Sequence, residues 1–216
     1  MKRNYKFYSD KSLMLLDVEN SIKPTNTVLD IGCGIRPQQY FKPKLHILCE
    51  PFRDYQNVLK EKFPNKHGYL RLQSTWEEVL FALPDKSIDT IFLLDVIEHL
   101  PKKTGIQLLK RTIEKAINQI VIFTPYGFIE QKHKDGIDLW GMKGGKWQEH
   151  RSGWMPSDFD SSWNIYIDKK FHPKTIINGK VFKPVHGAMF AIKNMSDIRT
   201  NSKLRQIFMK VKRKFT

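Results

Sequence analysis

Cysteine, long apolar runs and acidic residues are all scarce in this 216-residue sequence. The two cysteines, Cys33 and Cys49, argue against a disulfide framework and favour a reducing compartment. No apolar run approaches the roughly 20 residues that a transmembrane helix needs. The basic N-terminus is not followed by an apolar segment, so we expect no signal peptide. These absences, with no internal repeat or low-complexity segment, predict a globular cytoplasmic protein.

The shortage of acidic residues gives the chain a net charge of +15 and concentrates positive charge at the C-terminus. Residues 199–216 carry seven basic residues and no acidic one. Apolar residues recur among them at three- and four-residue spacing: Leu204, Ile207, Phe208, Val211 and Phe215. This pattern is typical of a basic amphipathic helix, which suits an anionic membrane surface. We expect peripheral contact at the inner membrane face; a helix docked on the domain and a frayed tail are the alternatives.

Apolar runs alternate with helical patterns through most of residues 1–198, which we predict to be one domain. Strands are expected at 27–32, 45–50, 67–73, 89–95, 120–124, 163–171 and 188–192. Helices are expected at 8–22, 54–63, 75–83 and 101–117. The first crossover, residues 33–44, leaves room for only a turn or two of helix, beginning at Pro37. The pattern predicts an α/β protein with a doubly wound, mostly parallel seven-stranded sheet and helices on both faces.

Residues 126–160 show no clear periodicity and are rich in glycine and tryptophan. A loop of this length inside a compact domain is usually functional. Its glycines would allow it to close as a lid on the acceptor side of a site. Further along, Asn178-Gly179 is typical of a hairpin turn.

Polar residues and glycines stand where the predicted strands end. The run Val28-Leu-Asp-Ile-Gly-Cys-Gly34 ends a buried strand in a Gly-x-Gly turn, and Glu50 ends the next strand 16 residues after Gly34. The fourth strand ends in Asp95-Val-Ile-Glu98. A Gly-x-Gly turn alone fits any tight strand–helix connection, but in parallel sheets ligands bind beyond the carboxyl ends of the strands. An acid at the position of Glu50 is typical of ribose recognition.

This ordered set resembles the Rossmann-like, S-adenosylmethionine-dependent methyltransferases. The resemblance rests on residues 28–34, on Glu50 and on Leu94-Asp-Val-Ile-Glu-His-Leu100, and it covers roughly residues 25–125. A looser resemblance, from Trp147-Gln-Glu-His-Arg-Ser-Gly-Trp154, is to methyltransferases of bacterial surface-glycan gene clusters. The resemblance implies S-adenosylmethionine as the cofactor and a glycan or another small polar molecule, methylated at oxygen, as the acceptor.

The resemblance also implies which residues hold the cofactor. Glu50 would take the ribose hydroxyls, and Asp95 would line the methionine end, with Glu98 and His99 near the transferring methyl. The full set of expected cofactor residues is Asp30, Gly32, Cys33, Gly34, Arg36, Glu50, Pro51, Phe52, Ser74, Thr75, Trp76, Asp95, Val96 and His99. The family commonly has glycine where this chain has Ile35-Arg36; Arg36 either pairs with the cofactor carboxylate or is a solvated surface residue.

Methyl transfer to a hydroxyl benefits from a general base, and histidine has a suitable pKa. His150 and His99 are the candidates. The residues expected to contact the acceptor are Tyr126, Trp147, His150, Arg151 and Trp154. Tryptophan faces suit sugar rings, although the same residues could form a small core under the loop. A metal cluster of His133, Asp135, Asp138 and His150 lacks recognisable ligand spacing, so no metal is predicted.

Three other functions were weighed against this one. An RNA methyltransferase would use the positive charge for phosphates, but the chain lacks a recognisable RNA-binding appendage and the Asn/Asp-Pro-Pro-aromatic run of amino-directed enzymes. A non-catalytic S-adenosylmethionine-binding scaffold is the second alternative. A nicotinamide oxidoreductase is disfavoured by the missing third glycine and by Asp95-Val-Ile-Glu98.

Overall fold

The structure, a computed structural model, describes residues 4–63, 68–133, 135–177 and 180–195. Its helices and strands are, in chain order, β1 (Asn4–Tyr8), α1 (Lys11–Ser21), β2 (Thr27–Ile31), β3 (Leu45–Cys49), α2 (Arg53–Lys62), β4 (Tyr69–Leu72), α3 (Trp76–Ala82), β5 (Ile88–Leu94), the 3₁₀ turn η1 (Ile97–His99), α4 (Lys102–Lys115), β6 (Ala116–Pro125), η2 (Gly145–Trp147), η3 (Pro156–Asp158), β7 (Trp163–His172), β8 (Thr175–Ile177), β9 (Lys180–Lys183) and β10 (His186–Asn194). Eight strands form one sheet in the order β1-β7-β10-β6-β5-β2-β3-β4, and β8 pairs with β9 separately. Strand β10 is antiparallel to β6 and β7, whereas the other neighbours in the sheet are parallel.

The predicted α/β class and mostly parallel sheet are confirmed, with three corrections. The sheet has one strand more than predicted, because β1 pairs in parallel with β7 at the sheet edge. The expected helix 8–22 is shorter: α1 begins at Lys11, after Asp10 Oδ1 accepts a hydrogen bond from the Ser12 amide (2.7 Å). The expected helical turn after Pro37 is absent, and residues 33–44 cross to β3 without a helix.

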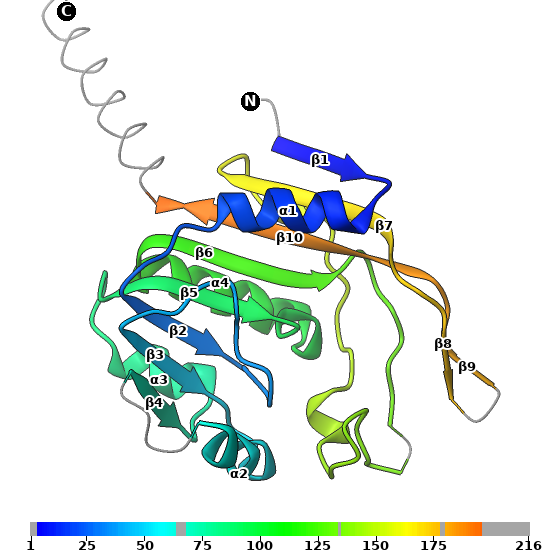
Figure 1. Ribbon diagram of the computed structural model, residues 1–216, viewed down its shortest axis with the longest axis horizontal. Coiled ribbons are helices and arrows are strands. Elements are labelled where there is room, and N and C mark those ends of the chain that lie inside the picture. Colours follow the sequence, from blue (N-terminus) through cyan, green and yellow to red (C-terminus); the bar gives the residue numbers. More distant parts are fainter. Residues whose placement is uncertain (1–3, 64–67, 134, 178–179, 196–216) are drawn as a thin grey trace, which may run out of the picture.

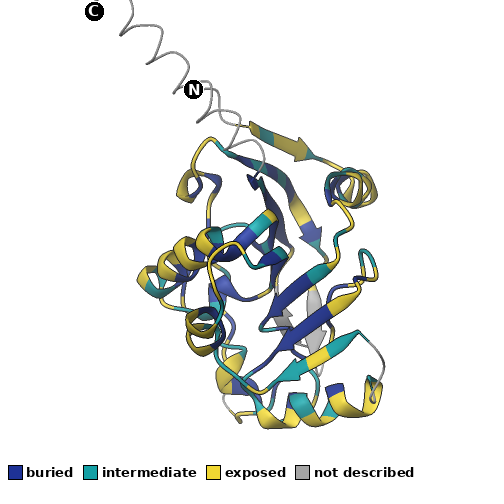
Figure 2. Cartoon of the chain, turned by 90° about the vertical axis from the view of Figure 1, so that its left-hand side faces the viewer, coloured by how far each residue is buried: buried dark blue, intermediate teal, exposed yellow. Residues whose placement is uncertain are grey.

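Helices cover both faces of the sheet, as predicted (Figure 1). On one face, Met14 and Val18 of α1 pack against β2, β5, β6 and β10, and Leu59 of α2 packs against β3. On the other face, α3 and α4 pack over a larger apolar cluster that includes Leu29 and Ile91. Figure 2 shows the result: the strands are largely buried, and the helices expose their outer sides. Alternating strand residues thus supply two separate cores.

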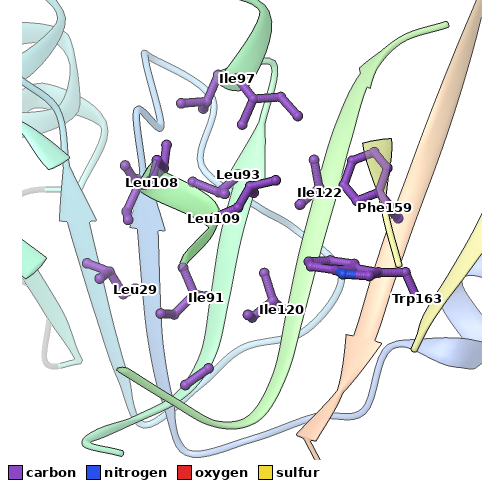
Figure 3. Packing of buried hydrophobic residues seen from close by; sticks show 14 of the residues in the cluster. Leu29, Ile91, Leu93, Ile97, Leu108, Leu109, Ile120, Ile122, Phe159 and Trp163 are labelled. Atoms are coloured by element: carbon purple, nitrogen blue, oxygen red, sulfur yellow. The ribbon is translucent and has the colours of Figure 1, made fainter. Parts of the chain in front are cut away.

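The segment between β6 and β7 contains no α-helix and covers its part of the sheet with aromatic side chains. Trp154, Phe159 and Trp163 are almost completely buried in the α3/α4 core, where Figure 3 shows Phe159 and Trp163 beside Ile122 of β6. Gly105 of α4 permits this packing, because a Cβ there would lie 2.5 Å from Trp154 Cζ2. The end of the long loop is therefore part of the core.

Two sequence predictions concern segments that the structure does not describe. The turn Asn178-Gly179 and the C-terminal tail 199–216 lie outside the described residues. None of the helices in the described part of the chain combines the length and apolar character that crossing a bilayer requires.

Candidate functional site

The carboxyl ends of β2, β3 and β5 meet in one place and carry the backbone conformations that the motif predicts. Gly32 and Gly34 after β2 have φ values of +63° and +54°, and Asp95 after β5 has φ +54°. A Cβ on Gly32 would lie 3.0 Å from Val96 Cγ2, so glycine lets the two turns approach closely. A non-glycine residue at positive φ, such as Asp95, is uncommon and typical of functional turns.

Glu50 holds the glycine turn in place from the end of β3. Its Oε2 accepts a hydrogen bond from the Gly34 amide (2.9 Å), and its Oε1 accepts one from the Phe52 amide (2.9 Å). Only 4% of Glu50 is exposed, and this burial raises the pKa of its carboxyl to about 7 despite the two hydrogen bonds. Each carboxylate oxygen retains a second lone pair for a ligand hydroxyl.

Asp30 lies behind the glycine turn. It is 1% exposed, and its Oδ2 accepts hydrogen bonds from the Gln38 amide (2.7 Å) and from His46 Nε2 (3.3 Å). Asp30 thus fixes the segment that replaces the first crossover helix. It lines neither of the cavities described below and supports the glycine turn from behind, so its expected contact with the cofactor stays a prediction.

The first cavity has a volume of about 300 Å³ and lies over these strand ends. Ten of the expected cofactor residues line it: Gly32, Gly34, Glu50, Pro51, Ser74, Thr75, Trp76, Asp95, Val96 and His99. The wall after β4 is fixed by the start of α3, where Glu78 Oε2 accepts from the Thr75 amide (2.8 Å) and Thr75 Oγ1 caps the helix. In this wall the Trp76 Nε1 donor is buried and has no hydrogen-bond partner in the described structure.

The remaining expected cofactor residues do not line the first cavity. Cys33 and Arg36 line the second cavity instead, with Arg36 exposed and Cys33 buried. Phe52 lines neither, because its ring packs against Tyr55 (4.8 Å between centroids) and faces Trp147 (6.4 Å). The Phe52 ring therefore supports the first cavity from outside.

The loop 126–160 closes over the first cavity through contacts that the sequence did not reveal. Tyr55 Oη donates a hydrogen bond to Asp138 Oδ2 (2.5 Å), and Asp138 Oδ1 accepts from the amides of Trp140 (2.8 Å) and Met142 (3.0 Å). Trp140 then packs edge-on against Tyr55 and lies directly over Gly34. Tyr55, Trp140, Trp147 and Gln148 all line the cavity. Residues 138–148, called the lid below, thus cover the first cavity, and the Tyr55–Asp138 hydrogen bond helps to hold them there.

The second cavity, about 610 Å³, adjoins the first and shares part of its wall. Residues that line both are Gly32, Gly34, Asp95, His99, Trp140 and Gln148. The rest of its wall includes aromatic residues and histidines: Tyr40, Phe123, His150, Phe171, His172, His186 and Phe190. Asp95 and His99 thus stand at the junction of the two cavities, where a ligand in the first cavity would lie next to a ligand in the second.

Both candidate bases lie at this junction. The rings of His99 and His150 are 5.1 Å apart between centroids. His99 Nδ1 lies 3.1 Å from the Glu149 carbonyl oxygen, and His150 Nδ1 lies 2.6 Å from the Ile129 carbonyl oxygen. Because a carbonyl only accepts hydrogen bonds, each Nδ1 is the protonated donor, and Nε2 carries the lone pair of the neutral ring.

Glu98 is a deeply buried acid in the wall of the second cavity. It is 2% exposed, lines the second cavity and accepts a hydrogen bond at Oε2 from Thr124 Oγ1 (3.0 Å). Burial, reinforced by the nearby Asp95 charge, holds the pKa of its carboxyl well above the usual range. Glu98 Oε1 is buried with no hydrogen-bond partner in the described structure.

Of the five residues expected at the acceptor, the structure brings two to the cavities. His150 lines the second cavity, and Trp147 lines the first. Trp154 is fully buried with its Nε1 donating to the Ile97 carbonyl (3.1 Å), so an acceptor contact is wrong for it. Arg151 is exposed and Tyr126 packs on the core; neither lines a cavity, and their contacts with an acceptor stay predictions.

Comparison with known proteins rests on structure, since no family model and no curated protein sequence matches this chain. A proposed methyltransferase from Bacillus halodurans aligns over 87% of this chain and 99% of its own, with 12% identity and a TM-score of 0.54. An S-adenosylmethionine-dependent methyltransferase from Archaeoglobus fulgidus aligns over 86% of this chain and 94% of its own, with 16% identity and a TM-score of 0.50. The chain has the class I methyltransferase fold. The YcgJ protein of Bacillus subtilis aligns over only 52% of its own length, with a TM-score of 0.43.

Proposed function

We propose that the protein is an S-adenosylmethionine-dependent methyltransferase that acts on a hydroxyl of a compact polar acceptor. The observation that carries the proposal is the first cavity, where the Gly32–Gly34 turn, Glu50 and Asp95 converge under the lid. The methyltransferase fold of the chain supports the same cofactor. The donor set fits: Glu50 can accept from ribose hydroxyls, and the unpartnered Trp76 Nε1 offers a hydrogen bond from the wall after β4.

S-adenosylmethionine, when bound, supplies an electrophilic methyl group on a sulfonium. The chain's part is to align the acceptor with it, to exclude water and to receive the acceptor proton. The lid residues Trp140 and Trp147 shield the first cavity, and the shared wall at Asp95 and His99 gives the acceptor its approach. His99 and His150 line the second cavity, and the tautomer of each ring supports a role for its Nε2 as the acceptor of the hydroxyl proton.

The size and lining of the second cavity support a compact acceptor. A volume of about 610 Å³ lies within the range of small-molecule sites, and aromatic faces suit a sugar or another ring. A glycan is therefore the first acceptor class to screen. One alternative is an RNA acceptor, whose phosphates the net charge of +15 would attract. The other is a non-catalytic S-adenosylmethionine-binding scaffold.

Calorimetric titration with S-adenosylmethionine and separately with NAD tests the cofactor. We expect S-adenosylmethionine alone to bind, and Glu50→Gln to weaken its affinity at least tenfold, because the neutral amide cannot replace the carboxylate acceptor. Glu61→Gln, an exposed change on α2, is the matched control and should bind normally. Binding of NAD alone, or of neither ligand, would contradict the proposal.

Methyl-transfer assays with labelled cofactor then separate the acceptor classes. Glycans and oligoribonucleotides are offered in parallel, and label incorporated into a hydroxyl-bearing small acceptor is the expected result. Label in RNA would favour the first alternative. Cofactor binding without transfer to any acceptor would favour the scaffold.

A further inference from the structure

We propose that Glu98, His99 and His150 bind a divalent transition-metal ion at the junction of the two cavities. These three side chains each offer one ligand atom, and the three atoms lie within 4.8 Å of one another. They come from two segments far apart in the sequence, η1 and the end of the lid loop. Only the folded chain assembles the set, which is why no ligand spacing in the sequence announces it.

The distances suit one ion after a small adjustment. Nitrogen and oxygen ligands stand about 2.0–2.2 Å from metals such as Zn²⁺, so two ligands of one ion are at most about 4.4 Å apart. The observed limit of 4.8 Å exceeds this by a few tenths of an ångström, which side-chain rotation can close. His99 and His150 are both half-buried, so each ring can tilt by this small amount while it keeps its Nδ1 hydrogen bond.

The histidines already have the tautomer and support that metal ligands need. Each donates Nδ1–H to a backbone carbonyl, that of Glu149 for His99 and that of Ile129 for His150. Such a donation fixes the ring orientation and leaves Nε2 as the basic nitrogen, which is the usual outer support of a metal-bound histidine.

The Glu98 carboxylate gives independent support for a cation site. It is 2% exposed, its Oε2 is oriented by Thr124, and its Oε1 is buried without a hydrogen-bond partner in the described structure. A buried carboxylate oxygen with no donor is costly unless a proton or a cation reaches it. The Glu98 carbonyl also accepts from the Arg151 (2.7 Å) and Ser152 (3.0 Å) amides, which fixes the His150 segment against η1.

The ligand set indicates the class of metal. Two imidazoles and one carboxylate suit Mn²⁺, Fe²⁺, Co²⁺ or Zn²⁺, whereas Mg²⁺ and Ca²⁺ prefer oxygen ligands. Three protein ligands leave positions open toward the second cavity, where an acceptor oxygen could bind. There the ion would orient the hydroxyl and ease loss of its proton before the sulfonium carbon–sulfur bond breaks and the oxygen–carbon bond forms. With the ion bound, the Nε2 lone pairs of His99 and His150 would serve as ligands, so the proton would pass to water and the ion would replace the histidine base of the proposed function. This role, unlike the binding site itself, rests on the proposed function.

Metal binding is tested directly on the full chain after treatment with a chelator. Mn²⁺ is titrated and followed by electron paramagnetic resonance, and Co²⁺ by its visible absorption, which reports nitrogen and oxygen ligands. We expect one equivalent to bind, and Glu98→Gln and His150→Gln each to weaken binding at least tenfold. His172→Gln, which removes a histidine of the same cavity outside the triad, should leave metal affinity unchanged.

Failure to bind Mn²⁺ or Co²⁺, or equal binding by wild type and both triad variants, would overturn the metal site. Thermal unfolding of each variant checks that a loss of binding is not a loss of fold. S-adenosylmethionine titration of the chelated protein keeps the two proposals apart. Cofactor binding without metal binding refutes only the metal site, and metal binding without cofactor binding refutes only the proposed function.

Discussion

At the scale of single residues, Glu50 combines two demands that pull its protonation in opposite directions. Its two backbone hydrogen bonds favour the ionised carboxylate, whereas burial favours the neutral acid and raises its pKa to about 7. A ribose hydroxyl needs an acceptor, so the ionised form is the one that binds cofactor best. The site is therefore sensitive to pH near neutrality.

Cofactor affinity should rise with pH through this range. As the pH goes from 6 to 8, Glu50 loses its proton, and we expect the dissociation constant for S-adenosylmethionine to fall several-fold. Glu50→Gln should bind weakly and show no such pH dependence, because its amide does not titrate. Calorimetry across the pH series measures both; an identical slope in the two proteins would contradict the assignment.

The same carboxyl should make the ligand-free protein less stable at higher pH. In the unfolded chain Glu50 ionises near pH 4.5, but in the folded chain it keeps its proton up to about pH 7. Between these values the folded state binds more protons, so the free energy of unfolding falls as the pH rises, by up to about 3 kcal/mol. Urea unfolding at pH 5 and pH 8 should show this loss in the wild type and a smaller one in Glu50→Gln.

Gly34 has a positive φ angle and lies close to Trp140. Replacing it, beside a control glycine that has only the positive φ, distinguishes backbone strain from the steric clash. In Gly34→Ala the new Cβ would lie 2.8 Å from Trp140 Cη2, in addition to the strain of φ +54°. Gly141→Ala is the matched control, because it has φ +78° and no atom within 4 Å of the new Cβ. Both should lose about 1 kcal/mol of stability. Only Gly34→Ala should displace the lid and weaken cofactor binding at least tenfold in calorimetry. An equal loss of cofactor affinity in Gly34→Ala and Gly141→Ala would contradict this.

At the scale of elements, the lid contacts α2 through the Tyr55–Asp138 hydrogen bond and through packing of Trp140 against the Tyr55 ring. Tyr55→Phe removes the donor to Asp138 without changing the ring, and it leaves a buried carboxylate oxygen short of a partner. The cost should be about 1–3 kcal/mol of lid closure. We expect faster proteolysis within residues 126–160 and weaker cofactor binding.

Tyr69→Phe controls for the loss of a hydroxyl, since Tyr69 packs on Phe63 and His46 away from the lid. Its proteolysis rate should equal that of the wild type. If Tyr55→Phe is cleaved no faster than this control, the hydrogen bond does not hold the lid.

Elements that a local pattern defines could be predicted from the sequence. Strands β2, β3 and β5 are apolar runs that end in glycine or an acid, so both their existence and the place of Gly32, Glu50 and Asp95 were predictable. Strand β1 was not, because its five residues are mostly exposed and owe their conformation to pairing with β7, about 160 residues away. Parallel pairing over such a distance leaves no local signal.

The lid shows the same limit at the site. Three tryptophans in an aperiodic segment look alike in sequence, yet Trp140 and Trp147 line the first cavity, whereas Trp154 belongs to the core. What separates them is their partners: Asp138 is fixed by Tyr55, and Trp154 fits against Gly105. Contacts between distant residues decide the outcome, and composition does not reveal them.

At the scale of the whole molecule, the positive charge is concentrated in a different part of the chain from the residues that line the cavities. The class I fold places its cavities at the carboxyl ends of the strands, and their walls combine aromatic side chains with the acids Glu50, Asp95 and Glu98, whereas Arg36 is the one lysine or arginine among them. Much of the net charge of +15 comes from residues 199–216, outside the described structure. Positive charge therefore bears on where the protein binds rather than on how it would hold a cofactor.

We propose that the tail brings the domain to an anionic membrane surface, where a lipid-linked acceptor would be found. Each basic residue near such a surface contributes about 1 kcal/mol, and the apolar residues at three- and four-residue spacing add burial. Deleting 199–216 should abolish sedimentation with phosphatidylglycerol vesicles and leave cofactor affinity unchanged, and phosphatidylcholine vesicles should bind neither protein. Replacing Leu204, Ile207, Phe208 and Val211 by serine keeps every charge. If that variant still binds as the wild type does, the attraction is electrostatic alone, and if the deletion itself still binds, the tail is not the anchor.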